Sequence, residues 1–277
     1  MKSLKTPLRY PGGKSRATKY LVPKFPKGIL EYREPFLGGG SVAIAFTKEN
    51  PDADVWVSDL YEPLVNFWQQ LQANGGHMRD ILSNAKYAHD TPDKARELFT
   101  HAKVGVNDPT VSALDRAVFF YIVNKCSFSG LTESSSFSAQ ASVSNFSHAG
   151  IEKLELYKEL IKNWTITHIS YEHVLVYPEK VNKSAFIFLD PPYDIKDNLY
   201  GNKGNLHKGF DHKLFCDRVK ECQLNWMITY NDNPTLREWL NGYHMHSWDL
   251  TYTMRSVGDY MQEQKDRYEL LVTNYEV

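Results

Sequence analysis

Seven short apolar segments along the chain have the length and composition of β-strands. They lie at residues 29–34, 55–59, 164–170, 184–190, 224–230, 245–252 and 267–274. Most are continuous apolar runs rather than alternating patterns, which is typical of strands covered on both faces. Apolar residues at helical spacing predict helices at 62–72, 92–103, 109–125, 150–163 and 234–241. Strands interleaved with helices indicate an α/β sheet.

The stretch from about residue 62 to residue 163 departs from this alternation, because its predicted helices follow one another without a strand between them. We interpret residues 75–163 as a largely helical insertion. Residues 1–74 and 164–277 then form one doubly wound domain. The chain is therefore expected to leave the sheet, build a second unit and return.

The segment 127–147 within the insertion contains nine serines interspersed with Phe128, Phe137 and Phe146. A flexible polar linker is the simplest interpretation of so many serines. Evenly interspersed aromatic residues are unusual in a pure spacer, and they favour a loop or hairpin that contacts another surface. A second, glycine-rich stretch at 197–210 follows the end of a predicted strand and is typical of a loop.

The overall charge favours no particular partner, because the 277 residues carry 32 basic and 33 acidic side chains and a net charge of -1. Any surface for nucleic acid must therefore be a local patch. Residues 1–28 carry eight lysines and arginines and no acidic residue. This segment is either a solvated basic face or a strip that contacts phosphates.

The three cysteines show no CxxC spacing, which favours a reducing compartment, and we expect a cytoplasmic protein. The basic N-terminus lacks the apolar core of a secretory signal, and no apolar run is long enough to span a membrane. His244 and His246 lie on one face of a predicted strand, but no carboxylate or cysteine has matching spacing. No metal site is therefore expected.

A glycine turn follows the first predicted strand. The sequence Gly38-x-Gly40-x-x-Ala43 fits the G-x-G-x-x-G/A pattern, in which glycines let a ligand approach the backbone closely. Asp59 ends the next strand, where its carboxylate can accept hydrogen bonds from both hydroxyls of a ribose. Nicotinamide dinucleotides, flavins and S-adenosylmethionine all fit this pattern. A tight turn with Asp59 as a helix cap is the purely structural alternative.

The tetrapeptide Asp190-Pro191-Pro192-Tyr193 ends a predicted strand, and ligands of open α/β sheets bind at the carboxyl ends of strands. Its prolines stiffen the turn and leave carbonyl acceptors beside a carboxylate and an aromatic ring. If Asp190 and the Pro191 carbonyl held the amine of adenine, its lone pair would be free to attack a sulfonium methyl group. Tyr193 would stack on that base after it left its duplex. A proline turn that closes a strand is the structural alternative.

These motifs, with the N-terminal run Leu8-Arg9-Tyr10-Pro11-Gly12-Gly13-Lys14, resemble the Dam-family (D12 class) N6-adenine-specific DNA methyltransferases over nearly the whole chain. The resemblance implies a Rossmann-like, seven-stranded, S-adenosylmethionine-dependent methyltransferase fold. It also implies that the helical insertion recognises the target in double-stranded DNA and that Asp190, Pro191, Pro192 and Tyr193 are catalytic.

We expect the cofactor S-adenosyl-L-methionine to be bound by Tyr10, Lys14, Glu34, Pro35, Phe36, Gly38, Gly39, Gly40, Ser41, Asp59, Leu60, Ser170, Tyr171 and Asp190. We expect contacts with DNA from Arg9, Lys14, Asn124, Lys125, Phe128, Ser129, Gln140, Asn145, Lys196, Lys203 and Arg255. A cognate restriction endonuclease is an expected functional partner, with no physical contact implied.

The recognition segment departs from the pattern of family members that read GATC. Serine-rich SSSFSAQASVSNFS stands there, and no arginine occurs between residues 117 and 217, although arginine to guanine is the commonest specific base contact. The DNA sequence that is read is therefore left open. Two other functions stay open as well: a methyltransferase of a protein amide, whose tetrapeptide generally begins with Asn, and a DNA-binding relative without catalysis.

Overall fold

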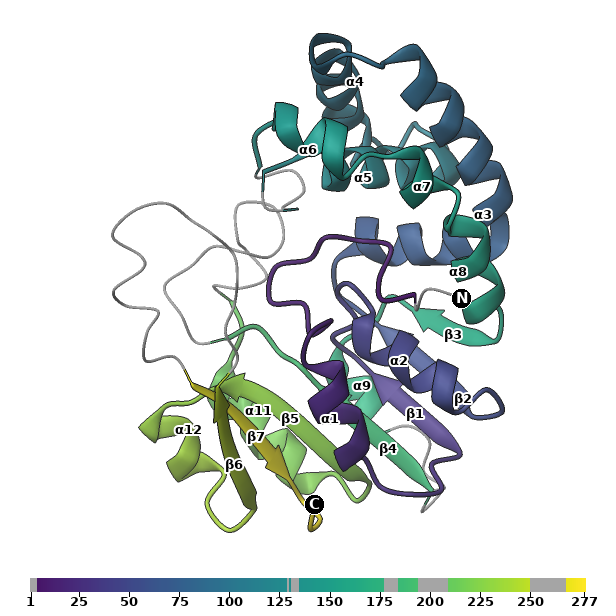
Figure 1. The fold of residues 1–277 in the computed structure, drawn as a ribbon. Coiled ribbons are helices and arrows are strands. Elements are labelled where there is room, and N and C mark those ends of the chain that lie inside the picture. The colour runs from purple at the N-terminus through teal and green to yellow at the C-terminus, as the bar shows by residue number, and fades with distance from the viewer. Residues whose placement is uncertain (1–3, 129, 131–134, 177–183, 194–208, 250–267) are drawn as a thin grey trace.

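The computed structural model describes residues 4–128, 130, 135–176, 184–193, 209–249 and 268–277. These residues form a seven-stranded sheet in the order β3-β2-β1-β4-β5-β7-β6, in which β1 to β5 are parallel and β7 is antiparallel to both neighbours (Figure 1). The strands are β1 (Glu31–Glu34), β2 (Asp54–Ser58), β3 (Trp164–Thr167), β4 (Ala185–Leu189), β5 (Asn225–Asn231), β6 (His244–Asp249) and β7 (Tyr268–Thr273). The α/β fold class and all seven predicted strands are confirmed.

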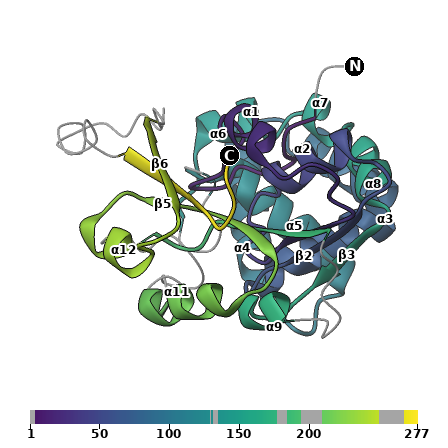
Figure 2. The ribbon, with the colours of Figure 1, turned by 90° about the horizontal axis from the view of Figure 1, so that it is seen from below.

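The central strand β4 shows why these segments read as continuous apolar runs. Its five residues are all buried. Phe186 faces the hydrophobic cluster that contains α2 (Ser41–Glu49), whereas Ile187 faces the cluster on the other side of the sheet, which contains α11 (His212–Glu221). Figure 2 shows helices on both faces of the sheet. A strand covered on both faces needs an apolar side chain at every position.

The remaining helices are α1 (Thr18–Leu21), η1 (Val22–Lys24), α3 (Glu62–Ala88), α4 (Pro92–Gly105), α5 (Ala113–Cys126), α6 (Ala139–Ser144), α7 (His148–Ile151), α8 (Leu154–Ile161), α9 (Tyr171–Val176) and α12 (Pro234–Trp239). The predicted helix at 150–163 is divided into α7 and α8. The sequence did not predict α1, α6 and α9, which are too short to show helical periodicity, nor α11, in which only three residues are buried. Among the described residues, no helix combines the length and the hydropathy that a bilayer-crossing segment needs.

Helix α3 carries the chain from the sheet into the insertion. The periodicity predicted only residues 62–72, but the helix continues to Ala88, with non-helical backbone at Asn74 (φ −126°, ψ 21°). Gly75 lets α8 approach closely, because a Cβ there would lie 2.9 Å from the Cβ of Lys158. This bend lies next to the predicted boundary at residue 75. The division of the chain into two domains stays a prediction.

The described part of the serine-rich segment is folded against the insertion. Ser127 and Phe137 form an isolated antiparallel bridge, after which the chain enters α6. Phe146 is fully buried, and Phe137 packs at the edge of the same core, whereas Phe128 is 60% exposed. These contacts agree with the hairpin interpretation and not with a flexible linker.

The order of the strands places the ends of two of them at one point on the sheet edge. β1 lies between β2 and β4, so the direction of winding reverses between β1 and β4. Glu34 ends β1, and Asp190 follows β4 directly. Ligands of open α/β sheets bind outside the carboxyl ends of strands at such a switch point. The fold therefore predicts a ligand-binding site in the region between Glu34 and Asp190.

Candidate active site

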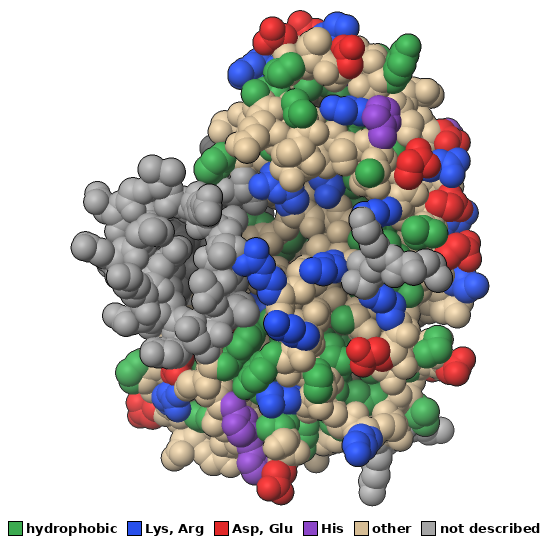
Figure 3. All heavy atoms as spheres, in the orientation of Figure 1, with side chains coloured by type: hydrophobic (Ala, Val, Ile, Leu, Met, Phe, Trp, Pro, Cys, Tyr) green, Lys and Arg blue, Asp and Glu red, His purple; other side chains and the backbone are tan. Residues whose placement is uncertain are grey.

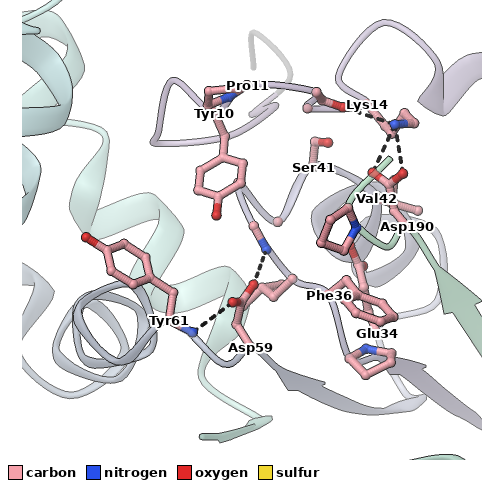
Figure 4. Close-up of a pocket in the computed structure, with 18 of the residues that line it drawn as sticks. Tyr10, Pro11, Lys14, Glu34, Phe36, Ser41, Val42, Asp59, Tyr61 and Asp190 are labelled. Atoms are coloured by element: carbon pink, nitrogen blue, oxygen red, sulfur yellow. Dashed lines mark hydrogen bonds and ion pairs between the residues drawn. The ribbon is translucent and has the colours of Figure 1, made fainter. Parts of the chain in front are cut away.

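A cleft opens at the carboxyl ends of β1, β2 and β4 (Figure 4). Of the residues that the sequence predicted for the cofactor, those that line it are Tyr10, Lys14, Glu34, Pro35, Phe36, Gly38, Gly39, Gly40, Ser41, Asp59, Leu60, Tyr171 and Asp190. Ser170 is not among the lining residues. Its hydroxyl accepts a hydrogen bond from the N–H of Glu172 at the start of α9 (3.4 Å). We therefore assign Ser170 to the helix terminus.

The glycine turn is tight because Gly38 (φ +47°) and Gly40 (φ +64°) have left-handed backbone conformations. Tyr10 packs on one side of the turn, where a Cβ at Gly38 would lie 2.9 Å from its ring. Trp68 packs on the other side, 2.7 Å from the position of a Cβ at Gly40, and its indole donates to the carbonyl of Gly38 (3.1 Å). Both positions therefore require glycine on grounds of backbone conformation and of space.

Asp59 is held by two backbone donors (Figure 4). The N–H of Gly38 donates to Oδ2 and the N–H of Tyr61 donates to Oδ1, each at 3.0 Å. Burial raises the pKa of Asp59, and these backbone hydrogen bonds oppose that rise. Tyr61 is the N-cap residue of α3, so Asp59 does not bond the first-turn N–H groups that a capping side chain takes. The carboxylate is instead fixed at the wall of the cleft, where each oxygen can accept one further bond.

Glu34 supplies a second, buried carboxyl group to the cleft. Only 3% of it is exposed, and the hydroxyl of Tyr32 donates to its Oε2 (2.6 Å). Burial raises the pKa of Glu34 to about 8, and the nearby charges of Asp190 and Asp59 act in the same direction. At neutral pH this carboxyl group is therefore mainly protonated, and it can donate a hydrogen bond as well as accept one.

Asp190 is held in place by two side chains. The ammonium group of Lys14 lies 2.8 Å from Oδ1 and 3.0 Å from Oδ2, and the hydroxyl of Thr229 donates to Oδ1 (2.8 Å). Lys14 is 2% exposed and also donates to the carbonyl of Gly12 (3.0 Å). Figure 4 shows this pair at the rim of the cleft. The N-terminal motif and the tetrapeptide are thus joined by an ion pair whose lysine is buried.

The rest of the tetrapeptide is divided between the cleft and its surroundings. Pro192 lines the cleft, whereas Pro191 is buried and, like Tyr193, is not among the lining residues. The ring of Tyr193 stacks on the ring of Tyr230, with 5.5 Å between centroids and 14° between planes. The Lys14 ammonium lies 4.8 Å from the centroid of the Tyr193 ring. The Lys14 ammonium therefore contacts both the Tyr193 ring and the Asp190 carboxylate.

Three aromatic side chains form an apolar wall of the cleft. Phe36 stacks on Tyr171, with centroids 5.4 Å apart and an interplanar angle of 26°. Phe210 meets Phe36 edge to face at 5.9 Å. All three residues line the cleft. A flat wall of this kind suits a heteroaromatic ring.

Two of the residues predicted to contact DNA, Lys14 and Asn124, are buried. The ammonium group of Lys14 is taken up by Asp190 and is not available to a phosphate. Asn124 is fully buried, donates to the carbonyls of Arg9 (2.6 Å) and Gly130 (2.9 Å), and accepts from the N–H of Arg9 (2.9 Å). Asn124 therefore ties the N-terminal motif to the insertion.

Other predicted DNA contacts lie nearer the surface. The Arg9 guanidinium donates to the carbonyl of Ser127 (2.8 Å). Burial, together with the charges of Arg9 and Lys153, lowers the pKa of Lys125 to about 8, so three cations gather here. Phe128 and Gln140 are exposed and Asn145 is half-buried. The predicted contacts outside the described residues are Ser129, Lys196, Lys203 and Arg255.

The structure also identifies site residues that the sequence did not. Thr229 reaches Asp190 from β5, which the sequence places far from the tetrapeptide. Phe210 and Tyr61 complete the wall of the cleft. Tyr61 stands two residues after Asp59, and this proximity is the one signal that pointed to it. The described residues contain no group of three His, Cys, Asp or Glu side chains that could hold a metal ion.

The geometry agrees with the comparison of the sequence with known proteins. Residues 10–254 match the family of D12 class N6 adenine-specific DNA methyltransferases. The chain is 22% identical to the type II methyltransferase M1.LlaDCHI of Lactococcus lactis subsp. cremoris, over 96% of this chain and 94% of that protein. It is 24% identical to a DNA adenine methylase of Haemophilus influenzae, over 85% of this chain and 82% of that protein. It is 22% identical to the type II methyltransferase M.CviBI of Paramecium bursaria Chlorella virus NC1A, over 98% of this chain and 100% of that protein.

The family match covers Tyr10 to Lys14 of the N-terminal motif, the glycine turn, the insertion and the tetrapeptide. The same segments line or adjoin one cleft at the switch point of a seven-stranded sheet. Sequence and structure therefore lead to one conclusion. The chain belongs to the D12 class of N6 adenine-specific DNA methyltransferases.

Proposed function

We propose that the protein transfers a methyl group from S-adenosyl-L-methionine to the N6 amine of an adenine that is flipped out of double-stranded DNA. The observation that carries the proposal is the position of Asp190. Its carboxylate lies in the wall of the same cleft as the glycine turn and Asp59. A donor held by the turn and an amine held by Asp190 would therefore meet in one cavity.

The residues of the cleft fit the chemistry of S-adenosylmethionine. Asp59 offers two fixed acceptors for the hydroxyls of a ribose. The wall of Phe36, Tyr171 and Phe210 suits the adenine ring of the donor. Glu34 can accept a hydrogen bond from the donor's ammonium group. When bound, the donor supplies an electrophilic methyl group on a positively charged sulfur.

The tetrapeptide would prepare the target amine for attack. Asp190 accepts one N–H of the amine and the carbonyl of Pro191 accepts the other, which favours a pyramidal nitrogen with an available lone pair. Lys14 and Thr229 fix the Asp190 carboxylate before the base arrives, so little reorganisation is needed. Tyr193 stacks on the base. Most of the acceleration then comes from orientation and preorganised electrostatics.

The duplex would lie across the middle of the molecule. Figure 3 shows a band of Lys and Arg side chains between the insertion and the sheet, with the acidic side chains mainly towards the edges of this face. The basic N-terminal segment crosses this region (Figure 1), and Arg9 and Lys125 lie where it meets the insertion. Phe128 projects from the same place, 60% exposed, and could fill the space that a flipped base leaves.

Two of the relatives are named type II methyltransferases, and we propose that this protein likewise protects DNA from a cognate restriction endonuclease without binding it. The alternative of a protein-amide methyltransferase is less well supported. The tetrapeptide of such enzymes generally begins with Asn, whereas position 190 carries Asp, and a protein substrate would not account for the basic band. A non-catalytic relative would not need the ion pair of Lys14 and Asp190 at the cleft.

The transfer of tritium from labelled donor tests this proposal, with unmethylated duplex DNA and a protein extract as the two acceptors. Label is expected in DNA alone, and Asp190→Ala should abolish it. Asp190→Asn is a second variant, whose amide oxygen can still accept from Lys14 and Thr229 at the position of Oδ1, and it should lose at least about 100-fold in kcat. Label in protein, or near wild-type transfer by both variants, would contradict the proposal.

The DNA surface has its own test. Binding of duplex DNA should weaken as salt rises, and Lys125→Ala should reduce the slope of log K against log salt by about 1. Lys220→Ala is the matched control, because Lys220 lies on α11 and pairs with Asp217. An equal change in both variants would exclude a specific phosphate contact of Lys125.

A further inference from the structure

The last strand of the sheet supplies a buried carboxylate to the tetrapeptide. Glu269 lies in β7 opposite Asn231 of β5, and only 3% of it is exposed. The hydroxyl of Tyr193 donates to its Oε2. Glu269 is not among the residues that the sequence predicted for the site. The role of Glu269 therefore has to be inferred from its contacts.

The Tyr193 ring is held at more than one point. Its face stacks on Tyr230, and the hydroxyl of Tyr230 in turn meets Nδ1 of His212. Stacking alone leaves a ring free to slide and tilt over its neighbour. The bond to Glu269 at the far end of the ring removes that freedom. The plane of Tyr193 is thus set by a face contact and by an end contact from different strands.

Packing alone does not require the hydroxyl of Tyr193 or the carboxyl group of Glu269. A phenylalanine would stack on Tyr230 as well as a tyrosine does. Burying a carboxylate costs free energy unless it is hydrogen-bonded, and an apolar residue in β7 would avoid that cost. Charge-assisted hydrogen bonds are shorter and about twice as strong as neutral ones, and they fix geometry accordingly. The hydrogen bond to Glu269 therefore orients the Tyr193 ring, which stacking alone would not do.

We propose that Glu269 is a positioning residue for the target base: by holding the Tyr193 hydroxyl, it sets the plane on which the flipped adenine stacks and so places the N6 amine at Asp190. This inference rests on the proposed function. Glu269 does not line the cleft, so it does not contact the methyl donor. Its effect should appear in the methyl-transfer step and not in donor binding.

A double-mutant cycle with Tyr193→Phe and Glu269→Met tests the inference, read out as kcat and KM on unmethylated duplex DNA and as the donor Kd by calorimetry. Each single variant is expected to lower kcat about tenfold, because a small misplacement of a reacting group has a large cost. The double variant should lose no more than either single variant, since both changes remove the same contact. Glu269→Gln, which keeps an acceptor, should recover part of kcat. Donor Kd should stay within about twofold of wild type.

Tyr275→Phe is the matched control, because its hydroxyl donates to the carbonyl of Lys24 (3.1 Å), away from the cleft, and its removal should leave kcat unchanged. Losses in kcat that multiply in the double variant would overturn the inference, as would wild-type kcat for Tyr193→Phe alone. A fall in donor affinity equal to the fall in kcat would overturn it too. If the wild-type protein transfers no label to DNA, the proposed function fails and this role fails with it. If the wild-type protein methylates DNA normally and the variants have wild-type kcat, the proposed role of Glu269 is wrong and the proposed function is unaffected.

Discussion

Replacing Asp59 by Asn tests how the cleft holds the donor. The carboxylate accepts the N–H groups of Gly38 and Tyr61, one on each oxygen, at 3.0 Å. An amide of the same shape can accept only one of them and turns its own N–H groups towards the other. The ribose hydroxyls then lose both the charge and one of their two acceptors. Hydrogen bonds to charged groups contribute about 1.5–3 kcal/mol each, so we expect a loss of about 2–4 kcal/mol in donor binding.

That loss corresponds to a rise in donor Kd of about 30- to 700-fold. Isothermal titration calorimetry with S-adenosylmethionine or its demethylated product measures it. Asp54→Asn is the matched control, because Asp54 is an exposed acid at the other end of the same strand. It should leave Kd unchanged. A wild-type Kd for Asp59→Asn would remove Asp59 from the site and refute the ribose assignment.

Three further predictions concern the supporting structure. The pKa of Glu34 is about 8 in the folded protein and about 4.5 in the unfolded chain. The free energy of unfolding should therefore fall as pH rises between these values, because only the folded protein still holds the proton. Urea titrations of Glu34→Gln at several pH values should lack this contribution to the pH dependence. Gly40→Ala should lower the free energy of unfolding, measured in the same assay, by about 1–3 kcal/mol more than Gly28→Ala. Both glycines have positive φ, but only a Cβ at position 40 would clash with a side chain, that of Trp68. Asn124→Leu should lower the free energy of unfolding by about 3 kcal/mol, against no change for the exposed Asn84→Ala, and equal stabilities would contradict the proposed link to the N-terminal motif.

The strands and the main motifs could be predicted from the sequence because each is a local pattern. A continuous apolar run such as that of β4 is dictated by burial on both faces, whatever its neighbours are. The glycine turn and the tetrapeptide carry their chemistry within a few residues. Their meeting in one cleft follows from the rule that ligands bind at the ends of strands.

The remaining site residues depend on the order of the strands, which is not a local property. Thr229 and Glu269 reach the tetrapeptide because β5 lies beside β4 and β7 lies beside β5. The environment of Lys14 could not be predicted from the sequence either. A lysine in a basic segment suggests a phosphate contact, whereas the structure shows Lys14 buried against Asp190. Charge along the sequence cannot distinguish a buried ion pair from a solvated one.

The central claim is that one cavity joins a methyl donor to the amine of a flipped adenine through Asp190. Mass spectrometry of nucleosides tests it most directly, after unmethylated duplex DNA has been incubated with the protein and donor. We predict N6-methyl-2′-deoxyadenosine as the single modified nucleoside with the wild-type protein, and none with Asp190→Ala. Methylated cytosine in place of methylated adenine, or equal N6-methylation by the variant, would contradict the account.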